Sequence, residues 1–119
     1  MRYISIFTHE QEAANKVPTP PSPEMMAKMG ALIEQGMKAG WLITTEGVSF
    51  GGRPVKVSSK KGKVTVVDGP FTEAKEVLGG YAVLEAKDRD HVVELTRQFL
   101  AVAGDGICEI HELYQPPAA

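Results

Sequence analysis

Two side chains in the sequence have the chemistry of an acid–base pair, the carboxylate of Asp68 and the imidazole of His111. A carboxylate that holds an imidazole produces a general base, which can remove a proton or activate water. Each residue also has a purely structural explanation. Asp is a favoured turn former, and a single His in a strand need not take part in a reaction. Asp68 and His111 are therefore catalytic candidates only if the fold brings them together.

Further polar and aromatic residues could line a pocket around this pair. Phe71 follows Asp68 in the stretch VDGPFTEAKE and is expected to anchor that loop in an apolar pocket. His9 lies at the end of the first predicted strand, where sites often form. The residues predicted to bind a substrate are Glu46, Phe71, Tyr81 and Glu109.

The sequence predicts neither a metal nor a cofactor. Its three histidines and single cysteine show no metal-ligand spacing. The stretch GVSFGGRP lacks the lysine and the following helix of a phosphate-binding loop. The one cysteine, Cys108, excludes an internal disulfide, which fits a reducing cytosol. Alternation places its thiol toward the core, where it would be inert.

The elements that must position these residues follow from periodicity and from capping residues. Alternating β-branched and aromatic residues predict strands over residues 3–7, 41–46, 81–87 and 107–114. Two short alternating runs on either side of Gly62 predict a β-hairpin. Ser22 and Asp88 are the predicted N-caps of two helices. The apolar face of the first helix, which includes Met25 and Met29, is interpreted as a core-facing stripe rather than an adaptable binding surface.

The order of these elements predicts an α+β fold, the ferredoxin-like βαββαβ plait with an inserted β-hairpin. One antiparallel sheet would carry both helices on one face. Residues 1–115 are expected to form a single domain, followed by a flexible tail at 116–119. The charged run after Phe71 is expected to be one helical turn over residues 73–78, capped by Thr72 and otherwise solvated.

The alternation of side chains also predicts what the second face of the sheet does. On the first strand, Ile4 and Ile6 are expected to face the helices, leaving Tyr3, Ser5 and Phe7 on the other side. Glu109 and His111 would share that other side. A face that mixes large aromatic residues with Glu and His is not fully solvated. The sequence therefore predicts a homodimer in which a second copy of the chain covers this face.

Composition excludes several classes of partner. The formal net charge of −2 gives no general attraction to nucleic acid or anionic lipid. The basic cluster of the predicted hairpin has no interleaved aromatic residues, so it is interpreted as a solvated tip rather than a nucleic-acid site. No apolar run approaches the ~20 residues of a membrane span. The N-terminal MRYISIF is too short for a signal peptide, and the chain is expected to be soluble and cytoplasmic.

The stretch VTVVDGPFTEAKEVLGGYAVLEAKDRDHVVEL resembles the DGPF-type branch of the YCII-related family. The stretches GWLITTEGVSF and GICEIHELY resemble other strands of that family. The resemblance implies a ferredoxin-like fold that dimerises into an α+β barrel. Some relatives are enzymes for which a His–Asp pair has been suggested, and others are linked with sigma factors. Where the closing strand of the family often carries Arg, this chain has His111, which replaces a permanent cation with a titratable group.

Two functions remain open at this point. The first is a small-molecule enzyme of the lyase or hydrolase type, with Asp68 and His111 as acid–base groups in a pocket enclosed by the dimer. The alternative is a non-catalytic dimeric module that senses a ligand or associates with the transcription machinery. The residues do not decide whether the protein is an enzyme.

Overall fold

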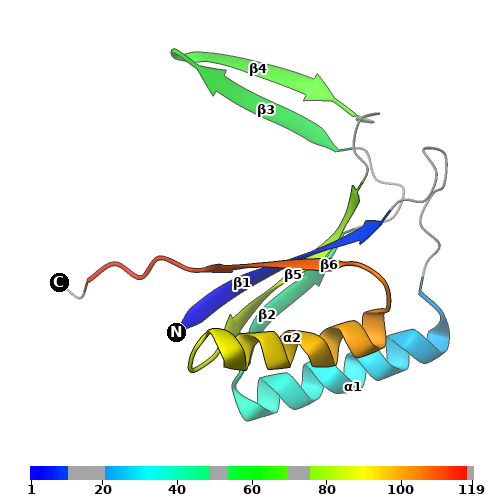
Figure 1. Cartoon of the computed structure of the whole chain (residues 1–119). Coiled ribbons are helices and arrows are strands. Elements are labelled where there is room, and N and C mark those ends of the chain that lie inside the picture. The colour runs from blue at the N-terminus through cyan, green and yellow to red at the C-terminus, as the bar shows by residue number, and fades with distance from the viewer. Residues whose placement is uncertain (11–20, 49–53, 70–75, 118–119) are drawn as a thin grey trace.

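A computed structural model describes residues 1–10, 21–48, 54–69 and 76–117. The elements are β1 (Arg2–Glu10), α1 (Pro23–Ala39), β2 (Leu42–Gly47), β3 (Val55–Lys60), β4 (Lys63–Asp68), β5 (Glu76–Glu85), α2 (Arg89–Ala103) and β6 (Ile107–Glu112). An antiparallel sheet has the order β2-β5-β1-β6, and β3 pairs with β4 in a separate hairpin. Figure 1 shows both helices on one face of the larger sheet. The predicted α+β, ferredoxin-like fold with an inserted hairpin is confirmed.

Both helices begin at the predicted N-caps. The hydroxyl oxygen of Ser22 accepts a hydrogen bond from the backbone N–H of Met25 at 3.1 Å. The carboxylate of Asp88 accepts one from the backbone N–H of His91 at 2.9 Å. These side chains satisfy N–H groups that have no acceptor within the first turn of a helix. The first helix ends at Gly40, whose φ of 85° is readily adopted only by glycine.

The strand β5 begins earlier than predicted. Pairing with β1 starts at Glu76, so the predicted helical turn is wrong for residues 76–78, and residues 70–75 lie outside the described part of the chain. The Gly-Gly pair is inside this strand rather than before it. A Cβ atom at Gly80 would lie 2.6 Å from the carbonyl oxygen of Glu46 on β2. The absence of a side chain at Gly80 therefore permits the close approach of the two strands.

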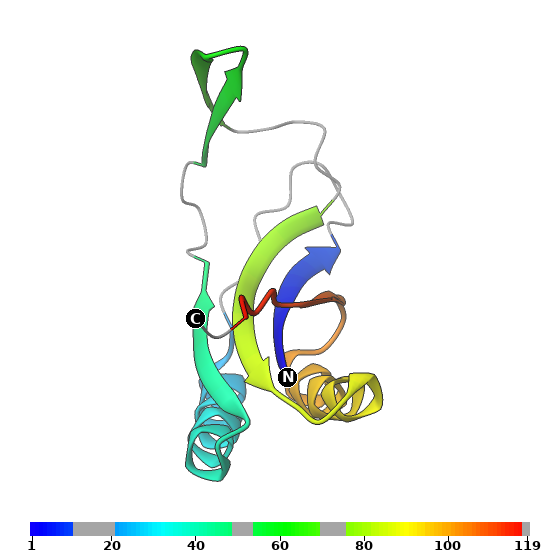
Figure 2. The same cartoon turned by 90° about the vertical axis from the view of Figure 1, so that its left-hand side faces the viewer.

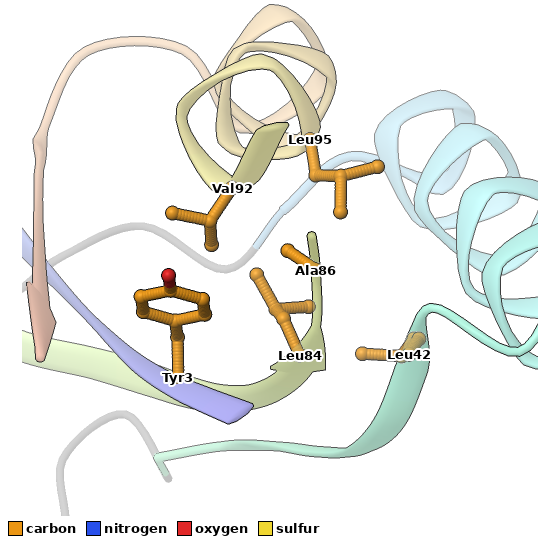
Figure 3. Close-up of a cluster of buried hydrophobic side chains, with 6 residues drawn as sticks. All are labelled: Tyr3, Leu42, Leu84, Ala86, Val92 and Leu95. Carbon is orange, nitrogen blue, oxygen red and sulfur yellow. The ribbon is translucent and has the colours of Figure 1, made fainter. Parts of the chain in front are cut away.

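A cluster of apolar side chains fills the space between the sheet and the helices. Its buried members are Tyr3, Leu42, Leu84, Ala86, Val92 and Leu95. In Figure 3, Val92 and Leu95 point from α2 toward Tyr3 and Leu84 on the sheet. Removing such side chains from water stabilises the fold by about 25 cal/mol for each Å² of apolar surface.

The prediction of which β1 residues face the helices is wrong. The residues of β1 buried on the helix-covered face are Tyr3, Ser5 and Phe7. By alternation, Ile4 and Ile6 belong to the other face. The pairing of Tyr3 with Leu84 explains this, because residues directly opposite each other on neighbouring strands point to the same face. Alternation identified the two sets correctly, but it did not identify which set the helices cover.

The hairpin formed by β3 and β4 stands apart from the sheet, on the side opposite the helices (Figures 1 and 2). Its turn contains Lys61 and Gly62, with φ values of 51° and 80°. Two positive φ values in a two-residue loop suit the twist of a hairpin, and the predicted turn is confirmed. All residues of β3 and β4 are exposed. In the described ranges, no helix is long and apolar enough to cross a membrane.

Candidate functional site

The uncovered face of the sheet carries two rows of side chains that cross all four strands. The strand pairings define the first row as Glu46, Tyr81, Ile6 and Glu109, and the second as Thr44, Val83, Ile4 and His111. Each row has apolar or aromatic residues on the two central strands and polar residues on the two edge strands. The face predicted to be covered by a partner is thus apolar along its middle and polar along both edges.

His111 and Glu109 form the one imidazole–carboxylate contact on this face among the described residues. The Nε2 atom of His111 lies 2.9 Å from Oε2 of Glu109, and both side chains point the same way because they are two residues apart on β6. A neutral imidazole that donates Nε2–H to the carboxylate has Nδ1 as a proton acceptor. Both side chains are well exposed, at 58% and 70%, so the contact by itself adds little stability.

Asp68 does not lie on the same sheet as His111. It is the last residue of β4 in the hairpin, where it pairs with Val55 across from β3. The next residue, Gly69, donates its N–H to the carbonyl oxygen of Pro54 at 2.8 Å. In the described residues, the carboxylate in contact with His111 is that of Glu109. A single copy of the chain therefore does not show Asp68 bound to His111.

Of the four predicted binding residues, three lie on one face of the sheet and one lies outside the described residues. Glu46 on β2 is paired with Tyr81 on β5, and both lie in the same row as Glu109. The structure therefore brings these three residues to one face of the sheet. Phe71 lies outside the described residues. The polar and aromatic face that alternation predicted is present, although Ile4 and Ile6 have taken the place of Tyr3 and Phe7 within it.

A second site lies on the opposite face of the sheet, between the sheet and the helices. A cavity of about 780 Å³ is bounded by the N-terminal half of α1, by α2 and by the ends of β1, β2 and β5. Its apolar lining includes Phe7, Met25, Met26, Met29, Leu32, Ile33, Trp41, Leu95 and Phe99. The volume is in the range of about 300–1,000 Å³ that holds small organic ligands. Unbranched methionine side chains can adapt to ligands of different shape.

The cavity is present because α1 packs only loosely on the sheet, and few of its residues are fully buried. Gly36 is its one buried residue, and it allows Trp41 to lie against the helix, since a Cβ there would be 2.8 Å from the indole ring. Met25 and Met29 are only half buried and line the cavity instead of a closed core. The interpretation of the methionine face as a simple core stripe missed this cavity. The repeated methionines were the signal that pointed to it.

Hydroxyl groups provide polar points on the cavity wall. Thr96 donates to the carbonyl oxygen of Val92 at 2.8 Å, and Thr45 donates to that of Tyr81 at 2.9 Å. Their protons are thus used within the protein, while the hydroxyl oxygens keep lone pairs that can accept a hydrogen bond. The cavity therefore suits a largely apolar molecule that carries a hydrogen-bond donor.

Aromatic rings order one end of the cavity. The ring of Phe7 packs edge-on against His9 with centroids 4.8 Å apart, and against Phe99 at 5.1 Å. A Cβ atom at Gly79 would be 2.8 Å from the Phe7 ring and 2.9 Å from Nε2 of His9. Glycine at this position makes room for both rings. The imidazole expected at the end of the first strand is thus a cavity residue.

The single thiol lies beside the cavity wall, under the helices. Cys108 is half buried and pairs with Phe7 across from β1. Burial raises the pKa of the Cys108 thiol, and a hydrogen bond with Ser5 acts in the opposite direction. A raised pKa lowers the fraction of reactive thiolate at neutral pH. Across the described ranges, no cluster of three or more His, Cys, Asp or Glu side chains is placed to hold a metal ion.

Comparison with known proteins agrees with this fold. Residues 1–115 match the YCII-related domain. No curated protein matches the chain.

Proposed function

Because the chain belongs to the YCII-related domain family, we propose that it is a homodimeric protein that binds a small, largely apolar molecule between α1 and the sheet. The observation that carries the proposal is the 780 Å³ cavity with its methionine and aromatic lining. Residues 1–115 would act as one domain, and the two copies would meet through the uncovered sheet face. This is the ligand-sensing form of a non-catalytic module.

The lining supports a particular class of ligand. Apolar side chains make up most of the wall, and burying ligand surface against them contributes about 25 cal/mol for each Å² before the costs of association. The hydroxyl oxygens of Thr45 and Thr96 can each accept one hydrogen bond. A compact ring system with one hydroxyl or amino group fits both properties. Indanol is a suitable probe of this class, and indane is the matched compound without the donor.

Trp41 supplies the measurement, because it is the one tryptophan of the chain and it lines the cavity. We expect 1-indanol to change the Trp41 emission in a saturable way, and indane to bind more weakly. A variant that fills the cavity should block this. Gly30 lines the cavity, and a Cβ added there meets nothing within 4 Å, so Gly30→Leu is the variant chosen to add bulk to this space.

The matched control is the neighbouring residue on α1. Ala31 lies in a shallow surface groove with Glu34 and Lys38, on another side of the helix. Gly30→Leu should weaken indanol binding at least about tenfold, which is about 1.4 kcal/mol, while Ala31→Leu should leave it unchanged. Equal binding by both variants, or no saturable response of Trp41 to either probe, would contradict the proposal.

Acid–base catalysis on the uncovered face is the second candidate, and the 2.9 Å contact between His111 and Glu109 favours it. Asp68 would then be contributed by a second copy, with Glu46, Tyr81 and Phe71 binding the substrate.

General acid–base catalysis contributes about 10²–10⁴-fold in rate. With p-nitrophenyl acetate as a hydrolysis probe, His111→Ala should remove most of the activity of the dimer. His91→Ala is the control, because its Nδ1 already accepts a hydrogen bond from the Lys87 N–H. Equal rates for the two variants would exclude His111 as the base.

A further inference from the structure

The imidazole of His9 is a polar group of the cavity in addition to the two threonine hydroxyls. His9 lines the cavity, and its ring packs edge-on against Phe7 with centroids 4.8 Å apart. Of its ring atoms, Nε2 and Cδ2 come closest to the position of a Cβ at Gly79, at 2.9 and 3.1 Å. Gly79 also lines the cavity. The Nε2 edge of the imidazole therefore lies at the cavity wall.

A shift in strand register brings the His9 ring to this place. Phe7 pairs with Gly80 and Thr8 pairs with Leu78, so Gly79 is the extra residue of a bulge in β5. A bulge bends its strand and changes the direction of side chains, and bulges are common next to active sites. Because Gly79 has no side chain, the rings of Phe7 and His9 can both lie against it.

The surface of the sheet beside His9 is made of glycines. Gly47 on β2 pairs with Gly80 on β5, and Gly80 pairs with Phe7 on β1. Residues directly opposite each other point to the same face, so β2 and β5 contribute only backbone to this row. Gly47, Gly79 and Gly80 all line the cavity and are called the glycine floor below. Glycines within strands often mark the close approach of a ligand, and a flat ring can lie on such a floor.

The side chains around the glycine floor favour an aromatic ring in particular. Phe7 and Phe99 pack edge-on with their centroids 5.1 Å apart, and both line the cavity. The partly positive edge of one aromatic ring is attracted to the partly negative face of another. An aromatic ligand can extend this set of edge-to-face contacts, whereas a saturated ring cannot.

The polar atoms of the cavity specify what the ring carries. The hydroxyls of Thr45 and Thr96 donate their protons to backbone carbonyl oxygens, so they can only accept from a ligand. A neutral imidazole has one accepting nitrogen, which is far more basic than a hydroxyl oxygen. A basic acceptor is best matched by an acidic O–H group. A phenol has such a group and keeps its proton at neutral pH, as tyrosine does. A carboxylate has no proton to offer these acceptors.

We propose that the ligand is a phenol, whose ring lies on the glycine floor and whose hydroxyl donates a hydrogen bond to His9. This inference rests on the ligand cavity proposed above and identifies the chemical class of the ligand. The apolar lining supplies the affinity for the ring. The imidazole selects the phenol over an apolar molecule of the same shape, so His9 is a specificity residue.

Two probes that differ in one group separate the hydrogen bond from the fit of the ring. 5-Indanol is a phenol, and 5-methylindane has a methyl group in place of the hydroxyl. Both are titrated at pH 8, where an ordinary imidazole is neutral, and binding is followed by the emission of Trp41. His9→Phe keeps a ring beside Phe7 but has no nitrogen. It should change the ratio of the two dissociation constants at least about tenfold against 5-indanol.

Matched variants distinguish the hydrogen bond from a change in packing. A change in the size of the cavity acts on both probes, so the ratio of their dissociation constants reports on the hydroxyl. His9→Gln keeps an acceptor oxygen and should restore part of the preference for 5-indanol. His91→Phe, on α2 outside the cavity lining, should leave the ratio unchanged.

The failure of this inference differs from the failure of the cavity itself. If both probes bind with the same ratio in the wild type and in His9→Phe, the role of His9 is overturned while the cavity stands. If neither probe changes the Trp41 emission in a saturable way, the cavity is contradicted and the phenol proposal falls with it. NMR of the wild type gives a measurement that does not depend on the folding of a variant. Saturating 5-indanol should shift the imidazole ¹⁵N signals of His9 and not those of His91, and unchanged His9 signals would overturn the proposal.

Discussion

The imidazole of His111 lies 2.9 Å from the carboxylate of Glu109, two residues away on the same strand. Alternation along β6 is sufficient to bring the two side chains to one face. The pair sits at the edge of the uncovered sheet face, where the neighbouring positions on β1 are Ile4 and Ile6. Acid–base chemistry and subunit association are therefore both proposed for one surface, and tests of each must be kept separate.

Chemical modification of His111 should depend on protein concentration. Diethyl pyrocarbonate acylates exposed imidazoles, and His111 is 58% exposed in a single chain. A second copy on the uncovered face would shield it. Mass spectrometry should find His111 modified several-fold more slowly at concentrations that favour the dimer. His91, on α2 at the other face of the sheet, is the internal control. If dimer formation slows the modification of His111 no more than it slows that of His91, association through this face is contradicted.

A methyl group at Gly36 should be strongly unfavourable. Its Cβ would lie 2.8 Å from the ring of Trp41 and 2.9 Å from the Cβ of Leu42. Forcing extra atoms into such a contact costs about 1–3 kcal/mol. Gly30→Ala on the same helix meets nothing within 4 Å and should instead stabilise the helix by about 0.5–1 kcal/mol. Urea unfolding monitored by circular dichroism gives both values. A neutral Gly36→Ala would show that Trp41 can move away from the helix.

Removing the cap of α2 should destabilise the chain moderately. Asp88 accepts the N–H of His91 at 2.9 Å, and replacing such a cap with Ala costs about 0.5–2 kcal/mol. Asp88→Asn keeps an acceptor oxygen and should retain most of the stability. The free energies of unfolding of the two variants, measured in urea, make the comparison. A similar loss in both would indicate that charge rather than hydrogen bonding makes the contribution.

Alkylation of Cys108 should be slow at neutral pH. Burial raises the pKa of this thiol, so the reactive thiolate is scarce at pH 7 and the rate should rise at a higher pH than for an ordinary exposed cysteine. The hydrogen bond with Ser5 lowers the same pKa, so Ser5→Ala should move the rate profile further upward. Iodoacetamide labelling followed by mass spectrometry measures the profile. A wild-type profile at or below that of a model thiol would contradict the effect of burial.

The sequence alone determined the features that depend on neighbouring residues. Both helix starts were predicted correctly, since a cap is a contact between residues three positions apart. The hairpin turn was predicted from Gly62, because glycine readily adopts a positive φ whatever its distant contacts are. The element order then predicted the α+β sheet with its inserted hairpin, and the family motif agreed with it.

The tertiary structure decided the features that depend on distant contacts. Periodicity shows that Tyr3 and Ile4 face opposite ways, but only pairing with Leu84 shows that Tyr3 faces the helices. The Gly-Gly pair could be a turn or a strand until the backbone of β2 lies against it. The cavity exists because α1 meets the sheet through Gly36 and leaves its methionines half buried. Asp68 lies on a hairpin apart from the strand of His111. The sequence did not reveal this, because strand pairing over long sequence separations is not encoded in local side-chain patterns.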